Sequence, residues 1–281
     1  MVGITNKTLI AEIRRQQQLS QGIVEGQTAI STGITLTKPS DNALAWVQVS
    51  EVGKAQAQQT AWQANVTLGS SRAANAEANL SQINTLLTRA QELVTSARNG
   101  SLNDSNRTAI VEEMKTIRTT VGSLLTQTDY QGVPVFDDTQ SVLVPVSRGL
   151  NLAVVGTRQD VSQGIDVNGT PMSLDDILGQ SLTAVQGGTD ADLVAALGAI
   201  KAGQSHIVVE QAKQGVRGDR LDTISDRLTS VDLDLSERRQ GLESTDLSQV
   251  ISSVKSKLLQ LDAAQSAFAR INQQTLFDLI R

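Results

Sequence analysis

The chain has 281 residues and a net charge of -5, with 24 basic and 29 acidic residues and no long run of one sign, so we expect no nucleic-acid partner. It contains no cysteine, which excludes disulfides, thiolate metal sites and cysteine nucleophiles. Aromatic residues make up only 2%, which favours thin packing by Ala, Leu, Ile and Val over a thick globular core. No stretch approaches the ~20 apolar residues of a membrane span, and the first residues lack the basic-then-apolar order of a secretory signal, so we expect neither membrane insertion nor a cleaved signal peptide.

The first predicted element is an amphipathic helix over residues 7–31. A short non-helical link follows at 35–41, because "STGITLTKPSDNALA" carries signals that end one helix and start another. The residues that we assign to this link and its borders are Thr32, Gly33, Pro39, Ser40 and Asp41.

A long helix follows, and its apolar residues repeat in steps of four and three, the period of a left-handed supercoil. Five of the eleven positions in this seam are Ala or Gly, which lets a neighbouring helix approach closely. The seam comprises Trp62, Val66, Gly69, Ala73, Ala76, Leu80, Ile83, Leu87, Ala90, Val94 and Ala97. Asn99 and Gly100 then provide a C-terminal stop.

A second heptad helix begins near 103–105 and runs through Leu124. The connection is short, so the two helices should be antiparallel. The residue pattern changes from Tyr130, where short Val-rich segments are separated by Gly, Pro and Asp-Asp. We interpret 131–172 as a small β-rich insert, with a hairpin at the Asn-Gly of "DVNGTP".

The last third of the sequence returns to helical patterns. A short helix is predicted over 173–180, a break at Gly187 and Gly188, and then a helix that is interrupted around Gly203. Heptads resume from Leu221 to Leu235. A bend or restart is expected near 241–246, where Asp246 and Gln249 form a capping pair, before a final helix.

These elements predict a mainly α protein, an elongated antiparallel coiled-coil helical bundle formed by the N- and C-terminal segments, with a small β-rich central insert. We divide it into terminal helices (1–34 plus 246–281), a helical rod (35–135 plus 188–245) and an outer insert (136–187). A helix with one apolar stripe cannot bury that stripe alone. Residues 7–31 and 247–280 should therefore pair with each other or with other copies, and should be largely disordered in an isolated monomer.

The chain offers little chemistry for catalysis. Its single histidine, His206, is expected to be an ordinary helical residue, and no nucleotide-binding glycine motif occurs. The pairs Asp137–Asp138 and Asp175–Asp176 could bind a cation or act as acid and base, but turn and helix-start roles are favoured. The Arg-Gly-Asp tripeptide at 217–219 directly precedes a heptad run, and we interpret it as a chance occurrence. We predict no enzyme, cofactor or metal site.

Several segments spaced along the chain resemble, in order, the bacterial flagellin-like family. The Ser-Thr-Gly...Pro-Ser-Asp form of the link is similar to the hook-filament junction branch, the third hook-associated proteins. The stretch "SARNGSLNDSNRTAIVEEMKTIRTTVGSLLTQTDYQGVPVF" resembles the family's helical turn, "GVRGDRLDTISDRL" its returning rod helix and "LESTDLSQVISSVKSKLLQLDAAQSAFARINQQTLFDLI" its C-terminal helix. Asn42 and Ala43 depart from the junction form, which often has Asp-Pro there.

The resemblance implies a structural subunit located outside the cell, at the hook-filament junction. Such proteins are exported unfolded through the flagellar type III channel, often with a chaperone. The implied partners are further copies, other hook-associated proteins and flagellin. The residues expected to form the assembly interface are Ile10, Ile13, Ile23, Leu247, Ile251, Val254, Leu258, Leu261, Phe268, Leu276 and Phe277.

Other functions stay open at this point. A short flagellin that forms the filament itself is the main alternative. A signalling hairpin would need a membrane anchor or a partner tether, a binding module would use the β-rich insert, and an enzyme ranks last.

Overall fold

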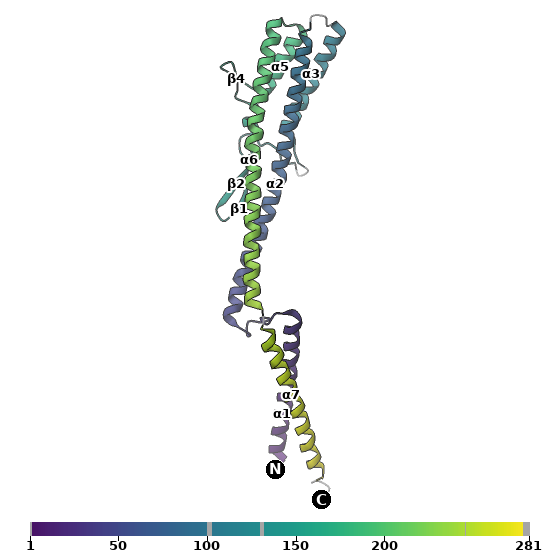
Figure 1. Cartoon of the computed structure of the whole chain (residues 1–281), viewed down its shortest axis with the longest axis vertical. Helices are drawn as coiled ribbons and strands as arrows, with labels where there is room; N and C mark the ends of the chain where they lie inside the picture. Colours follow the sequence, from purple (N-terminus) through teal and green to yellow (C-terminus); the bar gives the residue numbers. More distant parts are fainter. Residues whose placement is uncertain (1, 100–102, 130–131, 245, 278–281) are drawn as a thin grey trace. The chain divides into compact units, whose positions relative to one another are not determined.

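A computed structural model of the chain describes residues 2–99, 103–129, 132–244 and 246–277; the side chains of 2–9 and 271–277 lie outside this description (Figure 1). The elements in chain order are α1 (Val2–Thr32), α2 (Ala43–Ala97), α3 (Asp104–Leu125), β1 (Val142–Ser147), β2 (Leu150–Val155), α4 (Arg158–Ser162), β3 (Ile165–Val167), β4 (Thr170–Met172), α5 (Leu174–Gly187), α6 (Asp190–Glu243) and α7 (Leu247–Phe277). The predicted mainly helical class with a small β-rich centre is confirmed.

Contacts between residues divide the chain into two compact units. The terminal unit contains Met1–Ala57 and Asp232–Arg281, and the central unit contains Gln58–Val231. The long helices α2 and α6 each contribute one part to each unit.

In the central unit, α2 and α6 run antiparallel and side by side (Figure 1). Side-chain hydrogen bonds join them, and the residue numbers of the bonded partners rise along α2 as they fall along α6. Gln59 donates to the backbone carbonyl of Leu228 at 3.2 Å, Gln63 donates to Ser225 Oγ at 2.9 Å, and Gln204 donates to Thr88 Oγ1 at 3.2 Å. Every predicted seam residue on α2 is buried except Trp62, which is half-buried. The heptad prediction for this helix is confirmed.

The helix α3 begins where its sequence predicts. The Asn103 side chain caps it by accepting a hydrogen bond from the Asn106 backbone N–H at 2.8 Å. Its apolar face, which includes Met114, Ile117 and Val121, is buried, and the helix packs against α5.

Two antiparallel hairpins make up the β structure. One pairs β1 with β2 and the other pairs β3 with β4. Asn168 and Gly169 connect β3 to β4 with φ of 53° and 84°. Two consecutive positive φ angles are the signature of a type I′ turn, so the predicted Asn-Gly hairpin is confirmed. Among the described residues before Phe136, Thr128 and Pro134 form an isolated antiparallel bridge.

The short helix α4 was not predicted and lies within the segment that we interpreted as β-rich. Its signal is a capping box, in which the Thr157 hydroxyl accepts from the Asp160 backbone and the Asp160 carboxylate accepts from the Thr157 backbone. The predicted helix at 173–180 is present but longer, ending at Gly187 with Gly188 as its C-cap. Its predicted start is confirmed by a second capping box between Ser173 and Asp176.

Residues 136–187 share one apolar core with the helices of the central unit. Val144 and Val154 of the first hairpin lie over Gly69 of α2, where an added Cβ would come within 3.5 Å and 3.1 Å of their methyl groups. The predicted boundaries at 136 and 187 follow a change in the residue pattern of the sequence, from helical heptads to short Val-rich segments and back. Packing instead groups this segment with α2, α3 and α6, because the hairpin covers part of their apolar surface.

The predicted interruption at Gly203 is wrong, since α6 continues through this position without a break. Gly203 is buried, and a Cβ there would lie 3.4 Å from Leu174 and 3.6 Å from Ile177. The glycine marks a close approach of α5 to α6 rather than a helix end. The predicted restart near 241–246 is confirmed: α6 ends at Glu243, and Asp246 caps α7 by accepting from the backbone N–H groups of Ser248 and Gln249.

Candidate assembly interface

The terminal helices α1 and α7 pack against each other within one chain. Ile23 and Ala29 of α1 and Val254 of α7 are buried in the terminal unit. Of the two alternatives predicted for these helices, pairing within the chain is therefore observed in the structure.

Most of the predicted assembly residues with described side chains are not buried by the packing of α1 against α7. Those that stay exposed are Ile10, Ile13, Leu247, Ile251 and Leu258. Leu261 and Phe268 are half-buried, whereas Ile23 and Val254 are buried between the helices. The side chains of Leu276 and Phe277 lie outside the described residues.

Further exposed apolar side chains extend this surface beyond the predicted set. They are Val24 and Ile34 near the end of α1, Leu44 and Val47 at the start of α2, and Leu259 on α7. Leu44 and Leu259 are each 71% exposed. Their signal in the sequence is an apolar residue next to the heptad stripe, and that signal is weak because single exposed apolar residues are common.

The link between α1 and α2 is non-helical, as predicted. The helix α1 ends at Thr32, and Gly33 follows with φ of +71°, a conformation that glycine adopts without steric cost. The Asp41 carboxylate then accepts hydrogen bonds from the Thr37 backbone and hydroxyl and from the Lys38 backbone, at 3.0 to 3.1 Å. Pro39 and Ser40 lie in the turn that these bonds close.

The two predicted interruptions of the helical pattern meet in space. The Thr35 backbone N–H donates to the carbonyl of Glu243 at 3.0 Å, and Ile34 forms an antiparallel bridge with Ser244. Lys38 also forms an ion pair with Glu25 of α1 at 2.9 Å. The sequence predicts each interruption by itself, but contains no local signal for their pairing.

The residues considered for catalysis have structural partners. His206 lies on α6, with its Nε2 atom 2.8 Å from the backbone carbonyl oxygen of Asp160. Asp137 accepts from the backbone N–H groups of Thr139 and Gln140 in a turn, and Asp138 pairs with Arg158 at 2.6 Å. Among the residues with described positions, no cluster of three His, Asp or Glu side chains could hold a metal ion.

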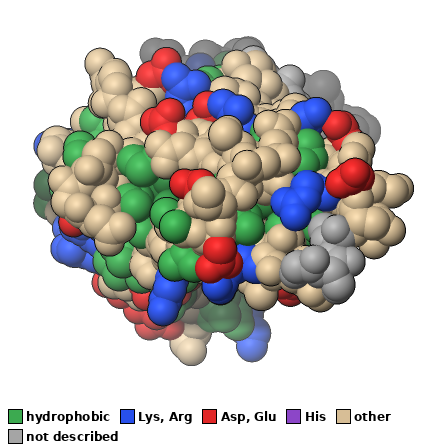
Figure 2. Space-filling model, turned by 90° about the horizontal axis from the view of Figure 1, so that it is seen from above, with side chains coloured by type: hydrophobic (Ala, Val, Ile, Leu, Met, Phe, Trp, Pro, Cys, Tyr) green, Lys and Arg blue, Asp and Glu red, His purple; other side chains and the backbone are tan. Residues whose placement is uncertain are grey.

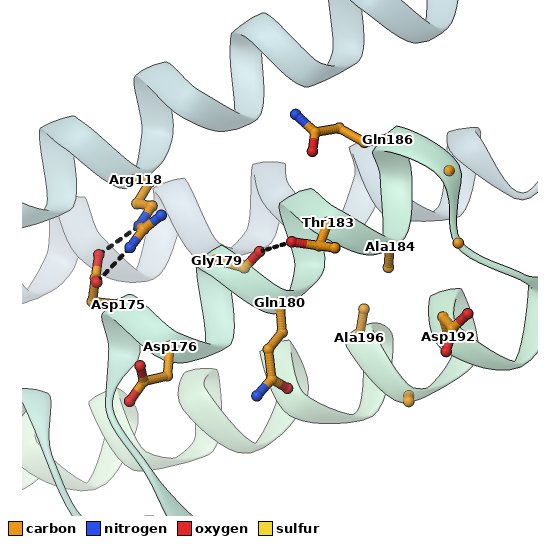
Figure 3. A pocket seen from close by; sticks show the side chains of 13 residues that line it. Arg118, Asp175, Asp176, Gly179, Gln180, Thr183, Ala184, Gln186, Asp192 and Ala196 are labelled. Carbon is orange, nitrogen blue, oxygen red and sulfur yellow. Dashed lines mark hydrogen bonds and ion pairs between the residues drawn. The ribbon is translucent and has the colours of Figure 1, made fainter.

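A groove of about 940 Å³ in the central unit is lined by Asp175 and Asp176 at the start of α5 and by Asp192 of α6, which lies beside the other end of α5 (Figure 3). Asp175 accepts two hydrogen bonds of 2.6 Å from Arg118 of α3, and these lower the pKa of that carboxyl although partial burial opposes the shift. Asp176 accepts from the Ser173 hydroxyl at 2.7 Å, and Asp192 from the Thr189 hydroxyl at 2.7 Å. The pair Asp175–Asp176 thus occupies the first turn of α5, as predicted.

The surface shows no large region of one charge on the face drawn in Figure 2, where basic and acidic side chains are interspersed. Within the described ranges, no helix combines the length and the apolar content that crossing a membrane requires. Among the described side chains, exposed large apolar residues occur in both units, and 11 of the 19 belong to the terminal unit.

Comparison with known proteins finds a family match in the N-terminal part of the chain. The family model for the bacterial flagellin N-terminal helical region matches residues 5–141. Residues 5–141 are therefore similar to the N-terminal helical region of flagellins. The match spans α1, the link, α2 and α3, so the link described above lies inside the flagellin-like segment.

A relative of nearly full length is flagellar hook-associated protein 3 of Salmonella typhimurium, which is 25% identical over 90% of this chain and 91% of the relative. A solved structure from Vibrio parahaemolyticus, described as a flagellar hook-associated protein, matches with a TM-score of 0.64 at 18% identity over 72% of this chain and 99% of its own. The flagellar junction protein of Legionella pneumophila matches with a TM-score of 0.54 at 14% identity over 70% and 100%. The predicted resemblance to flagellin-like proteins of the junction branch is confirmed.

Proposed function

We propose that this chain is a structural subunit of the bacterial flagellum and acts as an adaptor at the hook-filament junction. The proposal is supported by the similarity to hook-associated protein 3 along nine-tenths of the chain. The structural observation that carries it is the α1–α7 pair, which leaves Ile10, Ile13, Ile251 and Leu258 exposed. Exposed apolar side chains on both helices of a two-helix pair favour contacts with other subunits.

In this mechanism, the terminal helices (1–34 and 246–281) of neighbouring copies form an inner tube. The rod segments (35–135 and 188–245) form a layer around it, and residues 136–187 face outward. The terminal helices become fully ordered only where other copies cover their apolar faces, because the entropy cost of ordering them must be offset by new contacts. Assembly is then confined to the growing end.

The proposed partners are further copies of the chain, other hook-associated proteins and flagellin. We place the protein outside the cell in the flagellum, after export in an unfolded state and without cleavage of a signal peptide. An export chaperone would bind the same apolar terminal segments before assembly. No enzymatic activity, nucleic-acid binding or membrane insertion forms part of this function.

The direct test replaces Leu258 by Asp, because a buried unpaired carboxylate opposes packing between copies. We expect this variant to be exported but not incorporated, so that cells carry hooks without filaments. The matched control is Leu150→Asp in the first hairpin, since Leu150 is 50% exposed and Leu258 is 46% exposed. Normal filaments on cells that carry Leu258→Asp would contradict the proposed role.

A short flagellin remains the alternative, and the flagellin N-terminal region at 5–141 favours it as a second candidate. Purified protein added to filament seeds separates the two functions. An adaptor caps hooks without elongating, whereas a flagellin polymerises into long filaments.

A further inference from the structure

The contact between α1 and α7 is built on two glycines. Gly22 and Gly26 are four residues apart on α1, so they lie on the same face of the helix. We call them the glycine notch. Apart from proline, glycine is the poorest helix former, so two glycines in a helix interior weaken α1 as an isolated helix.

The notch is occupied by α7 of the same chain. A Cβ added at Gly26 would collide with a methyl group of Val254, and Val250 lies next to the same position at 3.8 Å. A Cβ added at Gly22 would lie 2.8 Å from the Lys257 ammonium nitrogen and 3.3 Å from its Cε atom. The Lys257 ammonium also donates to the backbone carbonyl of Gly22 at 3.4 Å.

These contacts select one face of α7. Val250, Val254 and Lys257 follow each other at spacings of four and three residues, which places them together on the helix. Val254 is buried and Lys257 half-buried, whereas Ile251 and Leu258, directly after Val250 and Lys257 in the chain, are exposed. The side chains that meet the notch are thus distinct from those left uncovered.

We infer that Gly22 and Gly26 are positioning residues: they direct the Val250–Val254–Lys257 face of α7 onto α1 of the same chain and so reserve Ile251 and Leu258 for other copies. The direction of this α7 face onto α1 concerns the single chain. Only the statement that Ile251 and Leu258 are reserved for other copies rests on the proposed function. Val254 is β-branched and stiff, whereas the Lys257 stem is flexible. Gly26 should therefore tolerate a methyl group less well than Gly22.

The test measures the intrachain contact directly, in the full chain. Because the protein contains no cysteine, cysteines in place of Ala29 and Val250, which line one pocket between α1, the link and α7, provide a unique disulfide pair. In dilute protein with a glutathione buffer, we expect this pair to form a bond within the chain. Adding Gly26→Ala should reduce its formation about tenfold, and Gly22→Ala should have a smaller effect.

Two further variants show whether a clash causes the loss. Gly53→Ala in α2 is the matched control, because a Cβ at Gly53 meets nothing within 4 Å, and bond formation should not change. Gly26→Ala can be repaired in the same chain by adding Val254→Ala, which removes the colliding methyl groups and should restore much of the bond. A merely weakened α1 would not be rescued in this way.

Equal bond formation in the Gly26→Ala and Gly53→Ala chains would overturn the inference, and so would bonds that form only between chains. Incorporation into flagella is scored separately. A chain that forms the intrachain bond normally but is not incorporated leaves the notch intact and counts against the proposed function alone.

Discussion

The terminal and central units use the same kind of long amphipathic helix but cover it to very different extents. In the central unit, the stripes of α2, α3, α5 and α6 and the inner faces of the hairpins form one buried apolar cluster from Val66 to Leu228. In the terminal unit, the buried apolar residues among the described side chains are Ile23, Ala29, Leu36, Val52 and Val254. Two helices alone leave part of each stripe uncovered.

The difference shows that a heptad pattern specifies which face is apolar, but not what covers it. The apolar stripes of the central unit are buried by other segments of the same chain, so the stability of this unit does not depend on other copies. The terminal unit has a specific but thin contact, and the rest of its apolar surface is available to other copies. We therefore propose that assembly is assigned to the terminal unit and independent folding to the central unit.

The largest effect should come from opening a cavity in the central core. Leu87 is fully buried, so Leu87→Ala should lower the free energy of unfolding by about 2–5 kcal/mol. Ile23→Ala, in the terminal unit, should change the unfolding of the monomer by less than ~0.5 kcal/mol because that region adds little to the cooperative core. Urea denaturation of both variants measures the two values. Equal decreases in the free energy of unfolding for the two variants would contradict the difference that we describe between the units.

A smaller effect of opposite sign is expected at Gly203. A Cβ there makes ordinary contacts with Leu174 and Ile177, so Gly203→Ala should raise the free energy of unfolding by roughly 0.5–1 kcal/mol through helix propensity. Gly218→Ala, on the same helix with nothing within 4 Å, is the reference. A clear decrease in the free energy of unfolding of Gly203→Ala would mean that the central core has as little space for a methyl group at Gly203 as the notch has at Gly26.

The smallest effect concerns the exposed ion pair between Arg118 and Asp175. The pKa of Asp175 is held below the ordinary value of 3.8, chiefly by hydrogen bonds from Arg118, so its stabilisation is present above that value and lost as pH falls through the depressed pKa. Asp175→Asn should cost about 0.5 kcal/mol at pH 7, since the pair is exposed, and nothing in strong acid. A loss that is independent of pH would rule out the ionic contribution.

The sequence predicts the helices and the α2 seam because apolar spacing directly reports which face is buried. It predicts the Asn168–Gly169 turn and the capped starts at Asn103 and Ser173 because those signals are local. It fails at Gly203, where a glycine looks the same whether it ends a helix or admits a neighbour. The pairing of Thr35 with Glu243 and the filling of the Gly26 position by Val254 depend on residues more than 200 positions apart, which no local pattern encodes.

Hydrogen exchange of the dilute monomer, read by mass spectrometry on peptides from each unit, tests the central claim most directly. The account predicts rapid exchange over residues 10–32 and 247–270 and slow exchange in the parts of α2 and α6 that belong to the central unit, with the terminal helices becoming protected only after assembly. Terminal helices as strongly protected in the monomer as the central core would contradict it.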